Sequence, residues 1–168
     1  MENHQLRIAG VVNDSIVDGP GYRFTIFTQG CPHRCPGCHN PQTHDPRGGS
    51  WIDTDELMGQ ILENPLLEGV TFSGGEPFSQ AEILAQLGRE IKKHGLSLWC
   101  YSGYTLESLL AMNKPSVNHL LEVVDVLVDG PFILQERDLE LSFRGSRNQR
   151  LIDLPASLAS GQAVMAVI

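Results

Sequence analysis

The 168-residue sequence has little positive charge, few cysteines and no long apolar run. No apolar stretch approaches the roughly 20 residues that a membrane-spanning helix needs. The first residues also lack the basic and apolar segments of a secretory leader. Lysine and arginine number 12 against 20 aspartates and glutamates, which disfavours broad contact with phosphate backbones. We therefore expect a cytoplasmic protein that binds neither membranes nor nucleic acid.

The four cysteines are unevenly placed. Cys31, Cys35 and Cys38 lie in one short loop, whereas Cys100 lies in an apolar run at 96–101. Three thiols cannot all pair internally, and closely spaced cysteines in a protein of the cell interior more often bind metal than form disulfides. We expect Cys100 to be a small buried residue of a strand.

Two kinds of metal site fit the loop. Structural zinc takes four ligands, and a histidine would have to be the fourth: His33, His39 or His44. An iron–sulfur cubane held by three thiolates leaves one iron open to an exogenous ligand. Zinc sites usually draw ligand pairs from separate segments, so a single loop favours iron–sulfur. A zinc-stabilised binding module without catalysis stays an alternative at this point.

Strand and helix signals alternate along the chain. Strands are expected where β-branched and aromatic residues are bounded by Gly, Pro or Asp, over 6–12, 22–28, 70–72, 96–101 and 123–128. Helices are expected to follow the N-cap candidates Asp53, Ser79, Thr105 and Ser116. This order predicts an α/β fold, a single-domain partial (βα) barrel with an open, mainly parallel sheet. One domain over 1–168 is expected, with its core at about 6–154 and an uncertain tail over 155–168.

Polar segments follow the predicted strands. Ligands bind at the carboxyl ends of parallel strands, so these segments are expected to share one mouth. After the strand at 70–72, Gly74 and Gly75 give the main chain freedom to approach a ligand, and Glu76 supplies a carboxylate for an ammonium group. On its own, Gly-Gly after a strand is more often a plain turn.

Together, the three-cysteine loop and the Gly-Gly-Glu segment resemble the signature of the radical S-adenosylmethionine superfamily. Within it, three further segments resemble the glycyl-radical-enzyme activases, above all those that act on anaerobic ribonucleoside-triphosphate reductases. They are Asp18-Gly19-Pro20-Gly21-Tyr22-Arg23, Cys38-His39-Asn40-Pro41 and Arg144-Gly145-Ser146-Arg147-Asn148-Gln149. The resemblance runs from about residue 8 to residue 150.

The resemblance implies a set of ligands and no catalytic side chain. Cys31, Cys35 and Cys38 would bind three irons of a 4Fe-4S cluster, and S-adenosylmethionine would chelate the fourth. Gly74, Gly75 and Glu76 would hold its amino group, and the main chain around Gly37, Cys38 and His39 would flank its adenine. Many relatives have an aromatic residue where Gly37 stands, so His39 is expected to take over that packing.

The resemblance also implies partners: a glycyl radical enzyme, the anaerobic reductase, and a low-potential electron donor such as flavodoxin. Two alternatives stay open, an activase of pyruvate formate-lyase and a small radical enzyme acting on a free metabolite. The segment from Arg144 to Arg150 either contacts the reductase or closes the sheet edge. The Asp18–Gly21 segment either helps to admit the loop of the reductase that carries the target glycine or is a plain turn. Asp129 is expected to be a turn residue.

Overall fold

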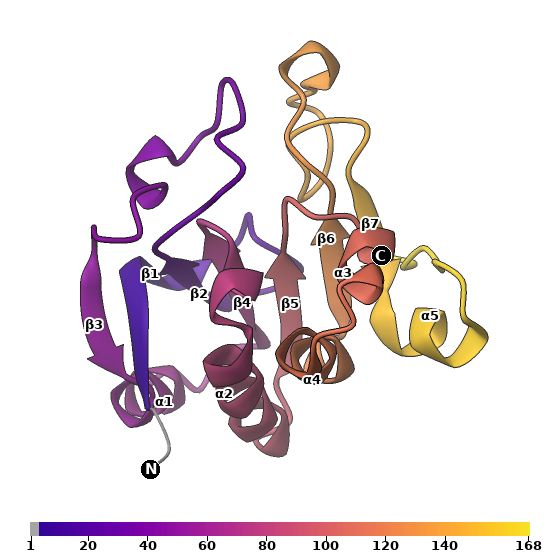
Figure 1. The fold of residues 1–168 in the computed structure, drawn as a ribbon. Helices are drawn as coiled ribbons and strands as arrows, with labels where there is room; N and C mark the ends of the chain where they lie inside the picture. The colour runs from indigo at the N-terminus through magenta and orange to yellow at the C-terminus, as the bar shows by residue number, and fades with distance from the viewer. Residues whose placement is uncertain (1–3) are drawn as a thin grey trace.

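The computed structural model describes residues 4–168. The expectation of no secretory leader falls partly on residues 1–3, which lie outside the described residues. The centre of the fold is a seven-stranded sheet in the order β3-β1-β2-β4-β5-β6-β7 (Figure 1). The strands are β1 (Gln5–Ser15), β2 (Arg23–Thr28), β3 (Ser50–Asp53), β4 (Gly69–Gly74), β5 (Ser97–Tyr101), β6 (Val126–Asp129) and β7 (Arg150–Asp153).

The four central strands, β2, β4, β5 and β6, pair in parallel, while β1, β3 and β7 pair antiparallel on the two sides. Because β3 and β7 end the sheet without meeting, the barrel stays open. This confirms the predicted open α/β sheet with a parallel centre. The sequence did not predict β3 or β7, since each is only four residues long and lies half-exposed at an edge.

Helices connect the parallel strands. The α-helices are α1 (Thr54–Leu62), α2 (Ala81–Lys93), α3 (Leu106–Ala111), α4 (Pro115–Val123) and α5 (Leu154–Ser160), and the short 3-10 turns are η1 (Pro41–Thr43), η2 (Pro77–Gln80) and η3 (Leu134–Glu136). Asp53 and Thr105 cap α1 and α3 as predicted, since each side chain accepts a main-chain N–H of the first turn. No helix within residues 4–168 is long and apolar enough to cross a bilayer.

Two predicted caps were wrong. Ser79 lies inside η2, so α2 begins later, at Ala81, and the carboxylate of Glu76 caps η2 by accepting the N–H of Phe78. Ser116 is already helical because α4 begins at Pro115, whose fixed φ suits the first helical position.

The side chains of the central strands point alternately to the two faces of the sheet. The face toward α1, α2 and α4 belongs to the apolar core, with Phe24, Phe72, Leu98, Cys100 and Leu127. The opposite, inner face is buried but partly polar, with Arg23, Thr25, Thr71 and Trp99. Cys100 is fully buried in the apolar core, as predicted, and burial raises the pKa of its thiol well above the usual value.

The tail packs along the outer edge of the sheet. After α5, Met165 forms an antiparallel bridge with Ile152 of β7. The main-chain N–H of Asp153 also donates to Val164, and the N–H of Ala166 donates to Leu151, each at 2.8 Å. The tail that the sequence left uncertain, 155–168, therefore adds an edge pairing to the sheet.

Candidate functional site

The carboxyl ends of the parallel strands open into one cavity of about 360 Å³, called here the mouth. Figure 1 shows that the loop after β2 and the segment between β6 and β7 rise from this same end of the sheet. The mouth is lined from five segments, and its lining includes Asp18, Cys31, Cys35, Cys38, Gly74, Gly75, Ser102, Phe132 and Arg144. The polar segments predicted to meet are therefore neighbours in space.

The three loop thiols are half-buried and free, and all of them line the mouth. The N–H of Cys38 donates to the carbonyl of Cys35 at 3.1 Å, which folds the loop tightly. The N–H of Asn40 donates to Cys38 Sγ at 3.4 Å. Such bonds stabilise sulfur ligands of iron–sulfur clusters and tune their potential. Burial raises the pKa of the Cys31 thiol, and the nearby Glu76 carboxylate acts in the same direction.

Within residues 4–168, no three histidine, cysteine, aspartate or glutamate side chains gather closely enough to hold a single metal ion. The histidines considered as a fourth zinc ligand have separate surroundings. His33 Nε2 lies 2.6 Å from Glu76 Oε1, and the His39 ring packs 5.2 Å from the Phe132 ring. His44 Nε2 is buried without a hydrogen-bond partner among the described residues.

Glu76 lies beneath the mouth rather than in its lining. Its carboxylate is fully buried and accepts hydrogen bonds from the Ser102 hydroxyl and the N–H groups of Phe78 and Gly103. With His33, these donors come from the cysteine loop, η2 and the end of β5. The carboxylate therefore joins three segments, and its contact with a ligand ammonium stays a prediction.

Gly75 lets the end of β4 pack directly on the cysteine loop. A Cβ atom at this position would lie 2.4 Å from the carbonyl oxygen of Gly30 and 3.0 Å from that of Thr43. The N–H of Glu76 donates to the same Gly30 oxygen at 2.8 Å. The glycine is required for backbone packing, and this packing places the Gly-Gly segment beside the thiols.

Phe132 is a lining residue that the sequence reasoning missed. It follows β6 and packs against His39, and a Cβ at Gly37 would lie 3.4 Å from its ring and 2.9 Å from Leu134. Gly37 itself has a φ of +75°, which favours glycine. The Phe132 ring thus lies next to Gly37, the position where many relatives have an aromatic residue, with His39 beside it. The signal available in the sequence was the segment Asp129-Gly130-Pro131-Phe132, which also resembles the pattern of the activases.

The Asp18–Gly21 segment folds onto the inner face of the sheet. The Asp18 carboxylate accepts the Ser15 and Thr25 hydroxyls at 2.5 and 3.1 Å, and its carbonyl accepts the Thr71 hydroxyl. Beneath it, Arg23 is fully buried, donates to Thr71 Oγ1 and lies 5.6 Å from the centroid of the Trp99 ring. Burial lowers the pKa of Arg23 to about 10. The turn is therefore rigidly held where Asp18 reaches the mouth.

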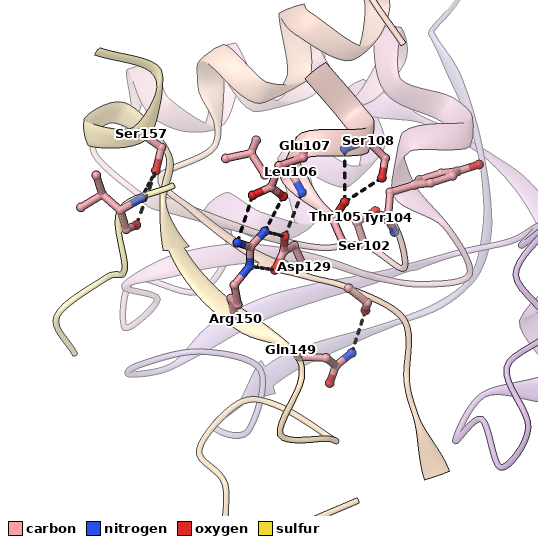
Figure 2. A network of polar contacts seen from close by, with 12 residues as sticks. Ser102, Tyr104, Thr105, Leu106, Glu107, Ser108, Asp129, Gln149, Arg150 and Ser157 are labelled. Atoms are coloured by element: carbon pink, nitrogen blue, oxygen red, sulfur yellow. Dashed lines mark hydrogen bonds and ion pairs between the residues drawn. The ribbon is translucent and has the colours of Figure 1, made fainter. Parts of the chain in front are cut away.

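The structure separates the roles left open for Arg144 and Arg150. Arg150 pairs with buried Asp129 of β6 and with Glu107 of α3 (Figure 2). Asp129 also accepts the N–H of Leu106 at 2.8 Å, so it serves as an ion-pair and helix-cap residue rather than as a simple turn residue. Arg150 therefore closes the sheet edge.

Arg144 lies at the mouth instead. One terminal nitrogen donates to the carbonyl of Gln149 at 3.1 Å, while its Nε is buried without a partner among the described residues. The Gln149 amide holds this loop by accepting the N–H groups of Gly145 and Ser146 and donating to Gly130. The terminal nitrogens of Arg144 carry further N–H donors beyond the bond to Gln149, and these are suited to a carbonyl or carboxylate entering the mouth.

The chain is similar to known proteins over most of its length. The family model described as "4Fe-4S single cluster domain" matches residues 17–152. The anaerobic ribonucleoside-triphosphate reductase-activating protein of Vibrio cholerae serotype O1 is 36% identical over 142 residues, which cover 80% of this chain and 89% of that protein. The protein of the same name from Escherichia coli K12 is 32% identical, covering 80% and 90%.

A second type of relative is the pyruvate formate-lyase 1-activating enzyme of Escherichia coli K12. It is 34% identical over 161 residues, which cover 92% of this chain and 63% of that enzyme. The region matched by the family model contains all three loop thiols, the Gly-Gly-Glu segment and Arg144.

Proposed function

The chain belongs to the family of the anaerobic ribonucleoside-triphosphate reductase-activating proteins, and from this we propose that it places a glycyl radical on such a reductase. It is a radical S-adenosylmethionine enzyme whose cofactors are a 4Fe-4S cluster and S-adenosylmethionine. Because the matching family model is a 4Fe-4S domain, iron–sulfur is favoured over the zinc alternative. The observation that carries the proposal is one mouth lined by three free thiols, two glycines and an aromatic ring.

The donor set suits the cluster. Cys31, Cys35 and Cys38 would hold three irons, which leaves the fourth open to the amino and carboxylate groups of S-adenosylmethionine. The chemistry that the two cofactors supply when bound is one-electron cleavage of the sulfonium, which gives methionine and a 5′-deoxyadenosyl radical. The Asn40 N–H would stabilise the thiolate of Cys38, with which it already forms a hydrogen bond.

The remaining residues of the mouth would position the two reactants. Gly74 and Gly75 expose main chain toward the methionyl amino group, while His39 and Phe132 form a wall on which the adenine would rest. Arg144 also lines the mouth, and the terminal nitrogens of its guanidinium would bind a main-chain carbonyl of the reductase segment that carries the target glycine. An unhindered glycine can enter deeply. Transfer of a hydrogen atom from its α-carbon to the 5′-deoxyadenosyl radical would give 5′-deoxyadenosine and the glycyl radical.

The proposal includes a low-potential electron donor, such as flavodoxin, and a cytoplasmic setting. Reduced thiols are the normal state in that compartment. Pyruvate formate-lyase is the second candidate target because its activating enzyme is also a relative, although this chain spans only 63% of that enzyme.

The test is a comparison of three anaerobic incubations with reconstituted enzyme, S-adenosylmethionine and a chemical reductant. One contains the reductase, one pyruvate formate-lyase and one neither. A glycyl radical signal in electron paramagnetic resonance (EPR) spectra with the reductase alone supports the proposal. A signal with pyruvate formate-lyase alone supports the second candidate, and cofactor cleavage without either signal supports an enzyme of a free metabolite.

A further inference from the structure

A second depression, called here the outer groove, lies beside the cysteine loop and has a volume of about 770 Å³. Its lining includes Arg7 of β1, Cys31 and Arg34 of the loop, and Trp51 of β3. Cys31 and His44 line both the outer groove and the mouth. Cys31, a predicted cluster ligand, and His44 therefore form part of the wall between the two depressions.

The outer groove is positively charged on an otherwise acidic protein. The chain has a formal charge of −8, yet the described residues that line this groove include Arg7 and Arg34 and no carboxylate. Beside Arg34, the exposed Arg47 pairs with Asp45, so this neighbouring pair leaves the net charge of the groove unchanged. A local positive field of this kind attracts an acidic protein and raises the rate of encounter.

The guanidinium of Arg7 donates to main-chain carbonyls, so no carboxylate offsets its charge in these bonds. Its Nε donates to the carbonyl of Gly48 at 2.6 Å, and a second nitrogen donates to the carbonyl of Arg47. The guanidinium also lies 5.1 Å from the centroid of the Trp51 ring. The side chain is thereby held in place at the groove without being neutralised.

Trp51 adds an apolar side chain to this positively charged groove. It is 58% exposed, whereas the other tryptophan of the sequence, Trp99, is buried. Exposed tryptophan and arginine side chains are the residue types most enriched where protein partners bind. The groove thus combines an aromatic anchor with fixed positive charges.

We propose that the outer groove docks the electron donor, a small one-electron carrier protein whose redox group is surrounded by acidic residues. The inference rests on the proposed function, in which S-adenosylmethionine and the glycine segment occupy the mouth. The electron must then enter from another side, and electron transfer slows steeply with distance. The outer groove is a positively charged surface that reaches a predicted cluster ligand, Cys31. At each encounter the donor loses one electron, the oxidised cluster gains it, and no proton has to move.

The experiment measures cluster reduction by two reductants in stopped-flow absorbance, using reconstituted holoenzyme. One is flavodoxin hydroquinone, an acidic protein, and the other is photoreduced 5-deazariboflavin, a small reductant that needs no docking surface. Arg34→Glu and Trp51→Ala are compared with Arg89→Glu, a matched charge change on the exposed side of α2. Iron content and midpoint potential are measured for each variant, so that a damaged cluster is recognised.

At low salt, Arg34→Glu should lower the second-order rate constant with flavodoxin roughly tenfold and weaken its dependence on ionic strength. Trp51→Ala should lower it roughly fivefold. Reduction by deazariboflavin should change less than about twofold in either variant, and Arg89→Glu should behave as wild type. Unchanged rates with flavodoxin, or equal slowing by Arg89→Glu, would overturn the docking proposal.

The same variants separate this inference from the proposed function. With deazariboflavin as reductant, Arg34→Glu should still place a glycyl radical on the reductase. If wild-type enzyme fails to do so under these conditions, the proposed function is wrong whatever the docking rates are. If the reductase instead protects Trp51 from fluorescence quenching by acrylamide and flavodoxin does not, the groove belongs to the reductase and the docking proposal fails.

Discussion

His33 Nε2 lies 2.6 Å from Glu76 Oε1, so a histidine between the thiols of Cys31 and Cys35 is joined to the buried carboxylate that follows β4. The same carboxylate accepts Ser102 and Gly103 from the end of β5. The two parts of the family signature are thus one hydrogen-bonded unit. This unit fixes the cysteine loop above the parallel strands.

Glu76→Gln should destabilise this unit. One oxygen becomes an NH2 group that faces N–H and O–H donors, and leaving a buried donor unsatisfied costs about 1–3 kcal/mol. For a chain of this size the thermal midpoint of the holoenzyme should fall by roughly 3–10 °C. Glu90→Gln, which alters an exposed pair with Lys93, is the control and should not shift the midpoint measurably. Equal midpoints for wild type and Glu76→Gln would show that the buried contacts contribute little.

Phe132→Ala should weaken binding of S-adenosylmethionine. Stacking of a base on an aromatic ring is worth about 1–3 kcal/mol, so the dissociation constant should rise roughly tenfold or more. Equilibrium binding to reconstituted enzyme gives this value directly. Leu139→Ala removes an exposed side chain of the same segment and should leave the constant unchanged. An unaltered constant for Phe132→Ala would remove this ring from the adenine site.

Arg144→Met and Arg150→Met should have different effects. Arg144→Met should keep cofactor cleavage in the absence of the reductase within about twofold, while the yield of glycyl radical falls roughly tenfold, because one bond to the entering segment is lost. Arg150→Met leaves buried Asp129 without its cation and should cost about 1–3 kcal/mol of stability, with radical yield per folded enzyme retained. Cleavage assays, EPR and thermal melts distinguish the two. Matching defects in both variants would contradict the separation of roles.

Cys100 should make stability fall at alkaline pH. Its thiol has a raised pKa in the folded chain, whereas in the unfolded chain it ionises near the ordinary value of 9.0. The stabilisation is complete below that value and is lost as pH rises above it, by up to about 1.4 kcal/mol per pH unit. Between pH 8 and 10 the thermal midpoint of the wild type should therefore fall further than that of Cys100→Ala. Parallel decreases would mean that this thiol is not buried as described.

The sequence predicted the parallel centre of the sheet because its strands are apolar, β-branched and separated by helical patterns. It also predicted that the polar segments share one mouth. It missed β3 and β7, since four-residue edge strands have too few residues for a periodic pattern. Ser79 satisfied the cap pattern, but Pro77 and Glu76 formed a 3-10 turn first.

Contacts between site residues that are far apart in the sequence could be identified only from the structure. Phe132 packs on His39 from a segment about 90 residues later in the chain, and local pattern gives no measure of such a distance. Likewise, Arg144 and Arg150 belong to one polar segment, and only the positions of Asp129 and the mouth separate them. The burial of the Glu76 carboxylate was hidden for the same reason.

The most direct test of the account measures iron, cofactor cleavage and glycyl radical on the same anaerobic preparations of wild type, Cys35→Ala and Cys100→Ala. Wild type and Cys100→Ala should contain about four irons, as one 4Fe-4S cluster requires, cleave S-adenosylmethionine and give a glycyl radical EPR signal on the reductase. Cys35→Ala should lose all three. Stoichiometric zinc without iron or sulfide in the wild type, or equal loss in the two cysteine variants, would contradict the account.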